Sequence, residues 1–334
     1  MSARAELIPD RGDAAVDAEF FRSRPFLDAE GATHTLRVEA DGGCLVAPLL
    51  VRTIGSGPER DAVSPYGYPG LVAAGRSPGS SRIAAALDPA AIDFSATGLV
   101  SVFLRHRLGP PPLLAASERN IVQIADPALP PKSRPSDRRQ IRKNLESGYE
   151  VLVVPGPRTS PGQRAGFLAV YEQTMVRTAA AERYFFAAAY FDRLLEAPRT
   201  WLALAFDAAG DVAAASLAAV SDGFLHYYLS GSADSHLRDS PMKNVVAALV
   251  GLAGELHLPL NLGGGISRGD ALEEFKRGFA NREESWHTSE IVCNEEKYKL
   301  LSAGRAPGDF FPAYRSQGRE APPAGHPPAE APRP

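Results

Sequence analysis

The chain has 334 residues, 44% of them apolar, which is enough to build packed cores in about two domains. Its 36 basic and 39 acidic side chains give a formal net charge of −3, which excludes a strongly basic protein that coats DNA or RNA. The longest apolar run, residues 245–254, is too short to cross a bilayer, and acidic residues interrupt the segment where a secretory signal would be apolar. We expect a cytoplasmic monomer with no membrane span.

The first half of the chain carries the weaker secondary-structure signals. Residues 1–18 show no apolar period and are predicted to be flexible. Strands are then predicted, in chain order, at residues 35–39, 45–54, 99–105 and 120–125, with a helical stretch at residues 81–87. This pattern indicates a degenerate copy of the mixed sheet that the second half predicts.

Prolines mark both the domain boundary and the C-terminal tail. Residues 130–135 contain three prolines and form a stiff linker, while six prolines in the last fourteen residues leave almost nothing there to bury. We therefore predict a first domain at residues 19–132, a second at residues 133–304 and a disordered tail at residues 305–334.

The second half has the clearer pattern. After a helix at residues 137–147, we expect the order helix, helix, three strands, helix, strand, helix, strand. These elements are predicted at residues 167–175, 185–195, 201–206, 212–220, 224–230, 241–256, 258–262, 270–279 and 286–293. The whole chain is therefore predicted to be an α/β protein built on mixed sheets.

The helix at residues 137–147 concentrates positive charge in a chain that is acidic overall. At about 100° per residue, four cations share one arc of this helix. They are Arg138, Arg139, Arg142 and Lys143. A phosphate-bearing partner fits such a site, and a solvated basic face is the alternative.

A second candidate site is the loop at residues 64–70, with the sequence SPYGYPG. Its prolines restrict the backbone and its glycines permit a positive φ, so Tyr66 and Tyr68 can be held rigidly around Gly67. Preorganised tyrosines suit the wall of a binding cleft. The alternative is a tight loop whose tyrosines pack on the core.

The third candidate site combines a strand end and a helix. Glycines at residues 263–265 follow a short apolar strand, where backbone could come close to a ligand, although a plain glycine turn is the alternative. In the next helix, Phe275 lies on the buried stripe and Lys276 lies at its border, where a lysine is either snorkelling or functional. Together with Tyr66, Gly67 and Tyr68, the predicted substrate-binding residues are Tyr227, Gly264 and Phe275.

Five segments, in this order, resemble the Fem-type peptidyltransferases of the GNAT superfamily. They are PYGYPG, RRQIRKNLESGYEV, RYFFAAAYFDRLL, the strand end LNLGGG and LEEFKRGF, and the resemblance covers roughly residues 20–300. It implies two tandem GNAT-like domains, the second better formed. The long coiled-coil arm of some family members is absent from the predicted elements.

The resemblance implies a reaction in which an amino acid moves from aminoacyl-tRNA to the amine of a peptide-like or small-molecule acceptor. Lys276 matches the lysine of the family's FKxxF motif, and a cation there would stabilise the oxyanion of aminolysis. The tyrosine loop would then wall the acceptor cleft and the basic helix would take tRNA phosphates. Since no serine or cysteine has a recognisable base, we expect direct aminolysis, with no metal and no resident cofactor.

Two other functions remain open on the sequence. An acetyl-CoA-dependent N-acetyltransferase would grip the coenzyme pyrophosphate with a glycine-containing turn before the helix at residues 241–256. At this place residues 238–243 lack both glycines, and Pro241 has no N–H to donate, so the sequence favours the tRNA-borne donor. The last alternative is a non-catalytic binding module with the same fold.

Overall fold

The computed structural model describes residues 3–9, 19–40, 43–74, 86–305 and 310–316. The strands of the first half are β1 (Ala3–Ile8), β2 (His34–Ala40), β3 (Gly43–Thr53), β4 (Arg60–Val63), β5 (Val72–Ala73), β6 (Ile92–Asp93) and β7 (Leu99–Arg105). Those that follow are β8 (Ser117–Ala125), β9 (Glu150–Pro155), β10 (Thr200–Phe206), β11 (Val212–Ser221), β12 (Phe224–Ser232), β13 (Leu260–Gly263) and β14 (Arg282–Val292).

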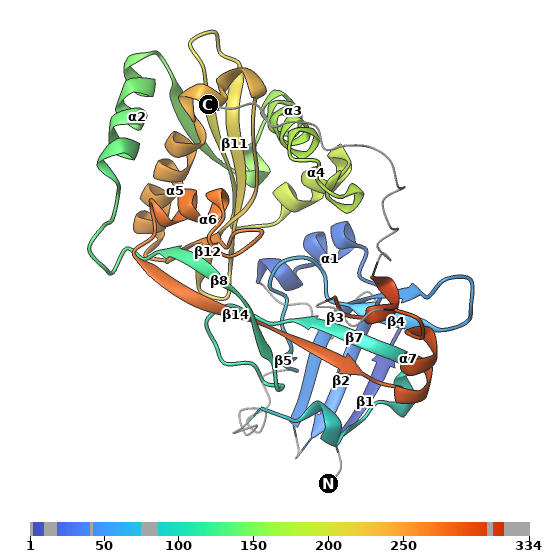
Figure 1. Ribbon diagram of the computed structural model, residues 1–334. Helices are drawn as coiled ribbons and strands as arrows, with labels where there is room; N and C mark the ends of the chain where they lie inside the picture. The colour runs from blue at the N-terminus through green and yellow to red at the C-terminus, as the bar shows by residue number, and fades with distance from the viewer. Residues whose placement is uncertain (1–2, 10–18, 41–42, 75–85, 306–309, 317–334) are drawn as a thin grey trace, which may run out of the picture.

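All these strands join into one mixed sheet that runs through both halves of the chain (Figure 1). Its order is β6-β1-β2-β3-β4-β7-β14-β8-β13-β12-β11-β10-β9, with β5 paired to β3. The last strand, β14, is antiparallel both to β7, where Thr288 lies opposite Arg105, and to β8, where Thr288 lies opposite Ser117. The last strand therefore lies in the middle of the sheet and joins the two halves.

The helices are α1 (Arg24–Glu30), α2 (Pro135–Glu146), α3 (Pro161–Arg177), α4 (Ala188–Glu196), α5 (Met242–Leu256), α6 (Ala271–Arg277) and α7 (Glu295–Leu301). Helices α3 to α6 pack against the second half of the sheet, whereas α7 packs against β7 in the first half (Figure 1). None of the helices in the described ranges is both long enough and apolar enough to cross a membrane. The longest of them, α3, has 17 residues, so a coiled-coil arm is absent from this part of the chain.

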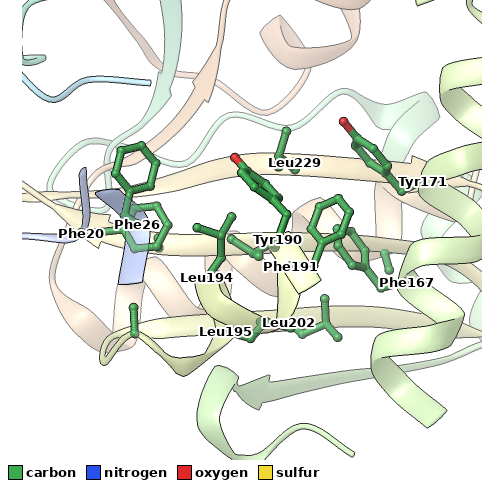
Figure 2. Close-up of a cluster of buried hydrophobic side chains, with 14 of the residues drawn as sticks. Phe20, Phe26, Phe167, Tyr171, Tyr190, Phe191, Leu194, Leu195, Leu202 and Leu229 are labelled. Atoms are coloured by element: carbon green, nitrogen blue, oxygen red, sulfur yellow. The ribbon is translucent and has the colours of Figure 1, made fainter. Parts of the chain in front are cut away.

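Alternating side chains of β10 separate two cores. Leu202 and Leu204 join the cluster under α3 and α4, whose aromatic members such as Phe167 and Phe191 are drawn in Figure 2. The alternate residues of β10, Trp201, Ala203 and Ala205, pack in the cluster under α5. Helices thus lie on opposite faces of the strands that carry the candidate site.

The first helix packs with the second half of the chain. Phe20 and Phe26 belong to the same cluster as α3 and α4, as Figure 2 shows for the labelled rings. Just before α1, Arg22 is 2% exposed and pairs with Asp222 in the β11–β12 turn at 2.9 Å. The same guanidinium donates to the carbonyl oxygen of Pro69, at 2.9 Å, and so holds the tyrosine loop against this junction.

The element order predicted from α3 to β14 is confirmed, and so is the mixed α/β class. The N-terminus differs from the prediction: Ala3–Ile8, expected to be flexible, form β1 between β2 and β6. This strand is short and buries only the alanines among its side chains, so its apolar period is weak. Strand β9, at the sheet edge, was also not predicted.

The C-terminal prediction differs over residues 310–316, which were assigned to a disordered tail. Tyr314 is 7% exposed and its hydroxyl donates to Asp61 at 3.2 Å. Arg315 adds an ion pair with the same carboxylate at 2.5 Å. Local composition does not reveal these partners, because Asp61 lies more than 250 residues away along the chain. Most of the helix predicted at residues 81–87, and residues 317–334, lie outside the described part.

Candidate functional site

Lys276 is a buried amine near the end of β13. Its side chain is 8% exposed, and Nζ donates to the carbonyl oxygen of Gly264 at 2.6 Å. Burial lowers the pKa of Lys276 to about 8, although the carboxylate of Asp270 acts in the opposite direction. The amine is therefore mostly a cation at neutral pH and has two further N–H donors.

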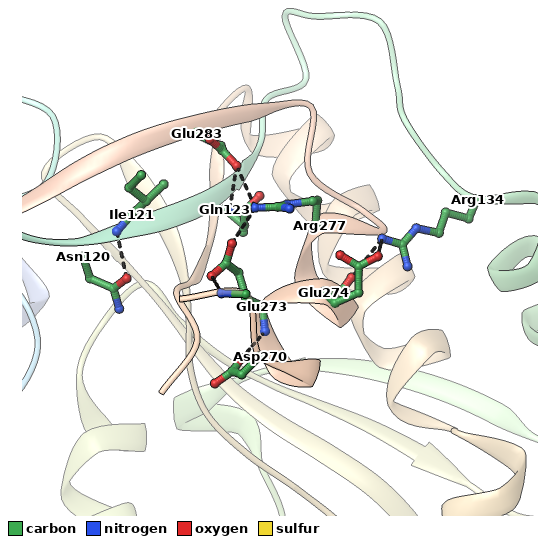
Figure 3. A network of polar contacts seen from close by, with 10 residues as sticks. Asn120, Ile121, Gln123, Arg134, Asp270, Glu273, Glu274, Arg277 and Glu283 are labelled. Atoms are coloured by element: carbon green, nitrogen blue, oxygen red, sulfur yellow. Dashed lines mark hydrogen bonds and ion pairs between the residues drawn. The ribbon is translucent and has the colours of Figure 1, made fainter. Parts of the chain in front are cut away.

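A polar network fixes the helix that carries Lys276 (Figure 3). Asp270 caps α6 by accepting from the backbone N–H of Glu273 at 2.8 Å. Arg277 pairs with Glu273 and reaches Glu283 of β14 at 3.4 Å, and Gln123 of β8 donates to Glu283 at 3.0 Å. Helix α6 is thereby fastened to both neighbouring strands.

The glycines before α6 are explained by close packing. Gly263 has φ +76°, and a Cβ there would lie 3.2 Å from Nζ of Lys276. A Cβ on Gly264 would approach the side-chain amide of Asn120 at 2.6 Å and the carbonyl oxygen of Ile121 at 2.7 Å. These two glycines let the strand end pack against β8 and against the lysine. Packing alone therefore explains why glycine stands at both positions, and no ligand is needed to explain it.

A cavity of about 250 Å³ lies where β12 continues beyond its pairing with β13. The two parallel strands pair only at Leu225–Leu260 and His226–Asn261. The cavity is lined from four elements, including Tyr227 and Ser230 of β12, Arg177 of α3, Met242 of α5, and Leu272 and Phe275 of α6. Two predicted substrate-binding residues, Tyr227 and Phe275, thus face one cavity, and Phe275 is the neighbour of Lys276.

The first turn of α5, at the rim of this cavity, has few free backbone donors. The N–H of Lys243 donates to the carbonyl oxygen of Ser240 at 3.0 Å, and that of Asn244 donates to Pro241 at 2.9 Å. Pro241 itself has no N–H. This turn therefore offers few backbone N–H groups that could bind a pyrophosphate.

The basic helix α2 packs beside α5 and α6. Buried Asn144 donates to the carbonyl oxygen of Asp239 at 2.8 Å and to the side chain of Asn244 at 2.7 Å. Arg134 pairs with Glu274 of α6, as Figure 3 shows. The four predicted tRNA-binding cations, Arg138, Arg139, Arg142 and Lys143, are all exposed. They lie on a helix that borders the Lys276 helix, not the tyrosine loop.

The tyrosine loop between β4 and β5 lies across the junction of the two halves. Gly67 has φ +99°, and a Cβ there would lie 2.4 Å from the ring of Phe21, so this position requires glycine. Tyr68 packs with Phe21 and His226 at ring-centre distances of 5.5 and 5.0 Å and with Trp286 at 5.6 Å. Tyr68 is therefore largely a packing residue.

Contacts connect the tyrosine loop to the Lys276 strand end. Tyr68 packs on His226, a ring nitrogen of which lies 3.0 Å from the side-chain amide of Asn261, and Oδ1 of Asn261 accepts the N–H of Gly263 at 2.8 Å. Lys276 lies against the same glycine. The loop, the glycine strand end and the lysine, which the sequence predicts as separate sites, are thus brought into one continuous region.

His226 behaves as a structural histidine in this region. It is buried, one ring nitrogen lies 3.0 Å from the amide of Asn261, and the other lies 3.2 Å from the carbonyl oxygen of Ser221. Burial lowers the pKa of His226 to about 4, so it is neutral at physiological pH. In the described ranges, no three His, Cys, Asp or Glu side chains gather as metal ligands would.

A polar group that the sequence does not predict lies beside Tyr66. Glu30, the last residue of α1, accepts the Tyr190 hydroxyl at 2.6 Å and the backbone N–H of Tyr66 at 2.8 Å. Burial raises the pKa of the Glu30 carboxyl. Arg105 of β7 lies over the Tyr66 ring at 5.1 Å. No local motif marks these residues, because their partners come from four distant segments.

The sheet order and the helices on its faces define a mixed α/β fold of the Fem-like type. The crystal structure of FemX shares it with a TM-score of 0.54 and 13% identity, covering 80% of this chain and 89% of that one. The structure of L-PGS from Bacillus licheniformis has a TM-score of 0.55 and 13% identity, covering 81% of this chain and 87% of that one. The C-terminal domain of a proposed lysylphosphatidylglycerol synthetase from Agrobacterium fabrum has a TM-score of 0.53 and 13% identity, covering 87% of this chain and 92% of that one.

No protein-family model matches the sequence, and no curated protein is similar to it. The predicted Fem-type resemblance is confirmed at the level of the fold.

Proposed function

We propose that this protein is an N-acyltransferase that moves an aminoacyl group from aminoacyl-tRNA to the amine of a peptide-like or small-molecule acceptor. The observation that carries the proposal is Lys276 in a Fem-like fold, a buried ammonium with its pKa lowered to about 8, held by Gly264 and next in sequence to Phe275, which lines a cavity. Among proteins with this fold is one whose name, lysylphosphatidylglycerol synthetase, describes joining an aminoacyl group to an acceptor.

The chemistry is direct aminolysis of the donor ester. The acceptor nitrogen attacks the ester carbonyl carbon, and the carbonyl oxygen becomes an oxyanion. Lys276 donates a hydrogen bond to this oxyanion from one of the N–H groups that Gly264 does not use. Collapse forms the amide C–N bond, breaks the ester C–O bond, and passes an amine proton to the released ribose hydroxyl.

Each remaining predicted residue has a place in this scheme. The aminoacyl end of the donor occupies the cavity that Tyr227 and Phe275 line. The exposed cations of α2, which borders α6, bind tRNA phosphates. On the acceptor side Tyr66 forms the wall, and Gly67 and Tyr68 hold it in place by packing on Phe21 and Trp286. The occupied amides at the start of α5 favour this donor over acetyl-CoA.

The decisive assay offers the purified protein a radiolabelled aminoacyl-tRNA mixture and acetyl-CoA in parallel, each with a panel of primary amines. We expect tRNA-dependent amide product and no acetylated product. Saturable acetyl-CoA binding with acetylated amines, and no transfer from tRNA, would replace the proposal with an N-acetyltransferase. Absence of transfer from either donor would favour a binding module.

A further inference from the structure

Glu30 is a carboxylate held in place without an ionic partner. Its two oxygens accept from the Tyr190 hydroxyl and the Tyr66 backbone, at 2.6 and 2.8 Å. In the part of the chain that the structure describes, no lysine or arginine forms an ion pair with it. A partly buried carboxylate without a cation costs folding free energy, which a bound ligand with positive charge would offset.

Arg105 is a cation near Glu30 that also has no ionic partner among the described residues. Its guanidinium lies over the rings of Tyr66, Trp286 and Phe103, at 5.1, 5.3 and 5.8 Å from their centres. Within the described ranges this guanidinium makes no hydrogen bond or ion pair. It still acts on Glu30 electrostatically, because it lowers the pKa of that carboxyl against the effect of burial. Opposite charges therefore lie near each other without being paired.

Tyrosine side chains gather around Tyr66, which contacts both charged groups. The rings of Tyr184 and Tyr228 lie 5.9 and 5.8 Å from that of Tyr66, and the hydroxyls of Tyr190 and Tyr228 are 3.3 Å apart. Tyr66 and Arg105 both keep partial exposure, as does Glu30, so a ligand can reach the group.

We propose that Glu30 and Arg105 form the acceptor subsite, and that the acceptor carries both an amine and a carboxylate, as a free amino acid or a short peptide does. The inference rests on the proposed acyl transfer. The ammonium of the acceptor binds Glu30 beside the tyrosine rings, and the acceptor carboxylate binds Arg105, whose planar guanidinium suits a bidentate contact.

Glu30 also has a chemical role in this arrangement. It takes one proton from the acceptor ammonium, which gives the neutral amine that attacks the ester carbon. The second amine proton leaves with the ribose oxygen when the ester C–O bond breaks, and Glu30 returns its own proton to solvent. A carboxylate that burial makes more basic is suited to this task.

Kinetic variants test the two roles separately. With carboxylate-bearing acceptors, Arg105→Gln should raise KM about 10- to 100-fold, while KM for the matching carboxamides stays unchanged. Glu30→Gln should lower kcat by about 100-fold and abolish the fall in rate at acidic pH. Arg119→Gln, which removes an exposed β8 arginine paired with Glu290, is the control and should behave as wild type.

A binding measurement separates this inference from the proposed function. Saturation-transfer NMR, without any acyl donor, uses a mixture of free amino acids with L-alanyl-L-alanine and the corresponding amides. We expect signals from carboxylate-bearing amines only, and their loss in Arg105→Gln. Equal binding of amides, binding indifferent to Arg105, or no binding at millimolar concentration would overturn the subsite. Binding without any acyl transfer would instead reject the proposed function.

Discussion

The Lys276 region and the Glu30 region differ in how the chain builds them. Lys276 is held by Gly264, twelve residues away, within one strand–turn–helix segment. Glu30 is held by Tyr66 and Tyr190, 36 and 160 residues away. Burial lowers the pKa of the lysine and raises that of the glutamate, so both pKa values move toward neutrality. Under the proposed function, the local site would supply the donor to the oxyanion and the non-local site would supply the base.

The largest expected effect is the fall in kcat when Lys276, the local site, is replaced. Lys276→Met keeps the buried volume but removes the cation, and kcat should fall by about 100- to 1,000-fold, the range for one oxyanion donor. Donor affinity should change much less, because the contact strengthens only in the transition state. Steady-state kinetics and donor binding check this, with Lys299→Met on exposed α7 as the matched control. A kcat near that of wild type would exclude Lys276 from catalysis.

The pH dependence of kcat compares both sites in one experiment. Above a pH of about 8, Lys276 loses its proton and the rate should fall about tenfold per pH unit. At acidic pH the rate should fall as Glu30 becomes protonated, at a pH above the usual range for glutamate because burial raises its pKa. A rate that keeps rising from pH 8 to 10 would contradict the role of the lysine.

The basic helix α2 should contribute to the salt dependence of tRNA binding. In the double variant Arg139→Gln/Arg142→Gln, the slope of log K for tRNA binding against log salt should shrink by about 1.4 to 1.8, since each phosphate contact contributes about 0.7 to 0.9. A matched control removes exposed arginines of the first half, as Arg4→Gln/Arg60→Gln. Equal slopes for both double variants would show that α2 does not contact tRNA.

The smallest effect concerns stability at the non-local site. Because the folded state raises the pKa of Glu30, it binds more protons than the unfolded chain, and stability is lost as pH rises through that window. Glu30→Gln removes the loss, so its Tm should exceed that of wild type by on the order of 1 °C at pH 7. The difference should vanish near pH 4. A lower Tm for the variant at pH 7 would mean that the carboxylate stabilises the fold.

The same contrast explains what the sequence could predict. Lys276, the glycine strand end and the tyrosine loop lie in short segments whose apolar period and turn residues are visible locally. Their assembly depends on sheet order, where β14 inserts between β7 and β8, and no local pattern encodes that position. Glu30 was missed because it ends a short helix as an ordinary charged residue, and only the packing of α1 on α4 brings it to Tyr190.

The tyrosine loop shows how far one motif can be interpreted from its sequence alone. The pattern of prolines and glycines predicts a rigid loop, and the positive φ of Gly67 against Phe21 supports this. It does not distinguish the two tyrosines, because Tyr68 packs on Trp286 and Tyr66 lies beside Glu30 and Arg105. Which ring meets a ligand depends on neighbours from the other half of the chain.

The central claim is that a poised ammonium at Lys276 acts on the acyl group. Its pKa can be measured directly by NMR titration of protein labelled at the lysine ε-carbons, with Lys276→Met to assign the resonance among the six lysines of the chain. We predict one resonance that titrates at a pKa of about 8, is missing in the variant, and matches the alkaline fall in kcat. Titration of all six near the ordinary value of about 10.4 would contradict the account.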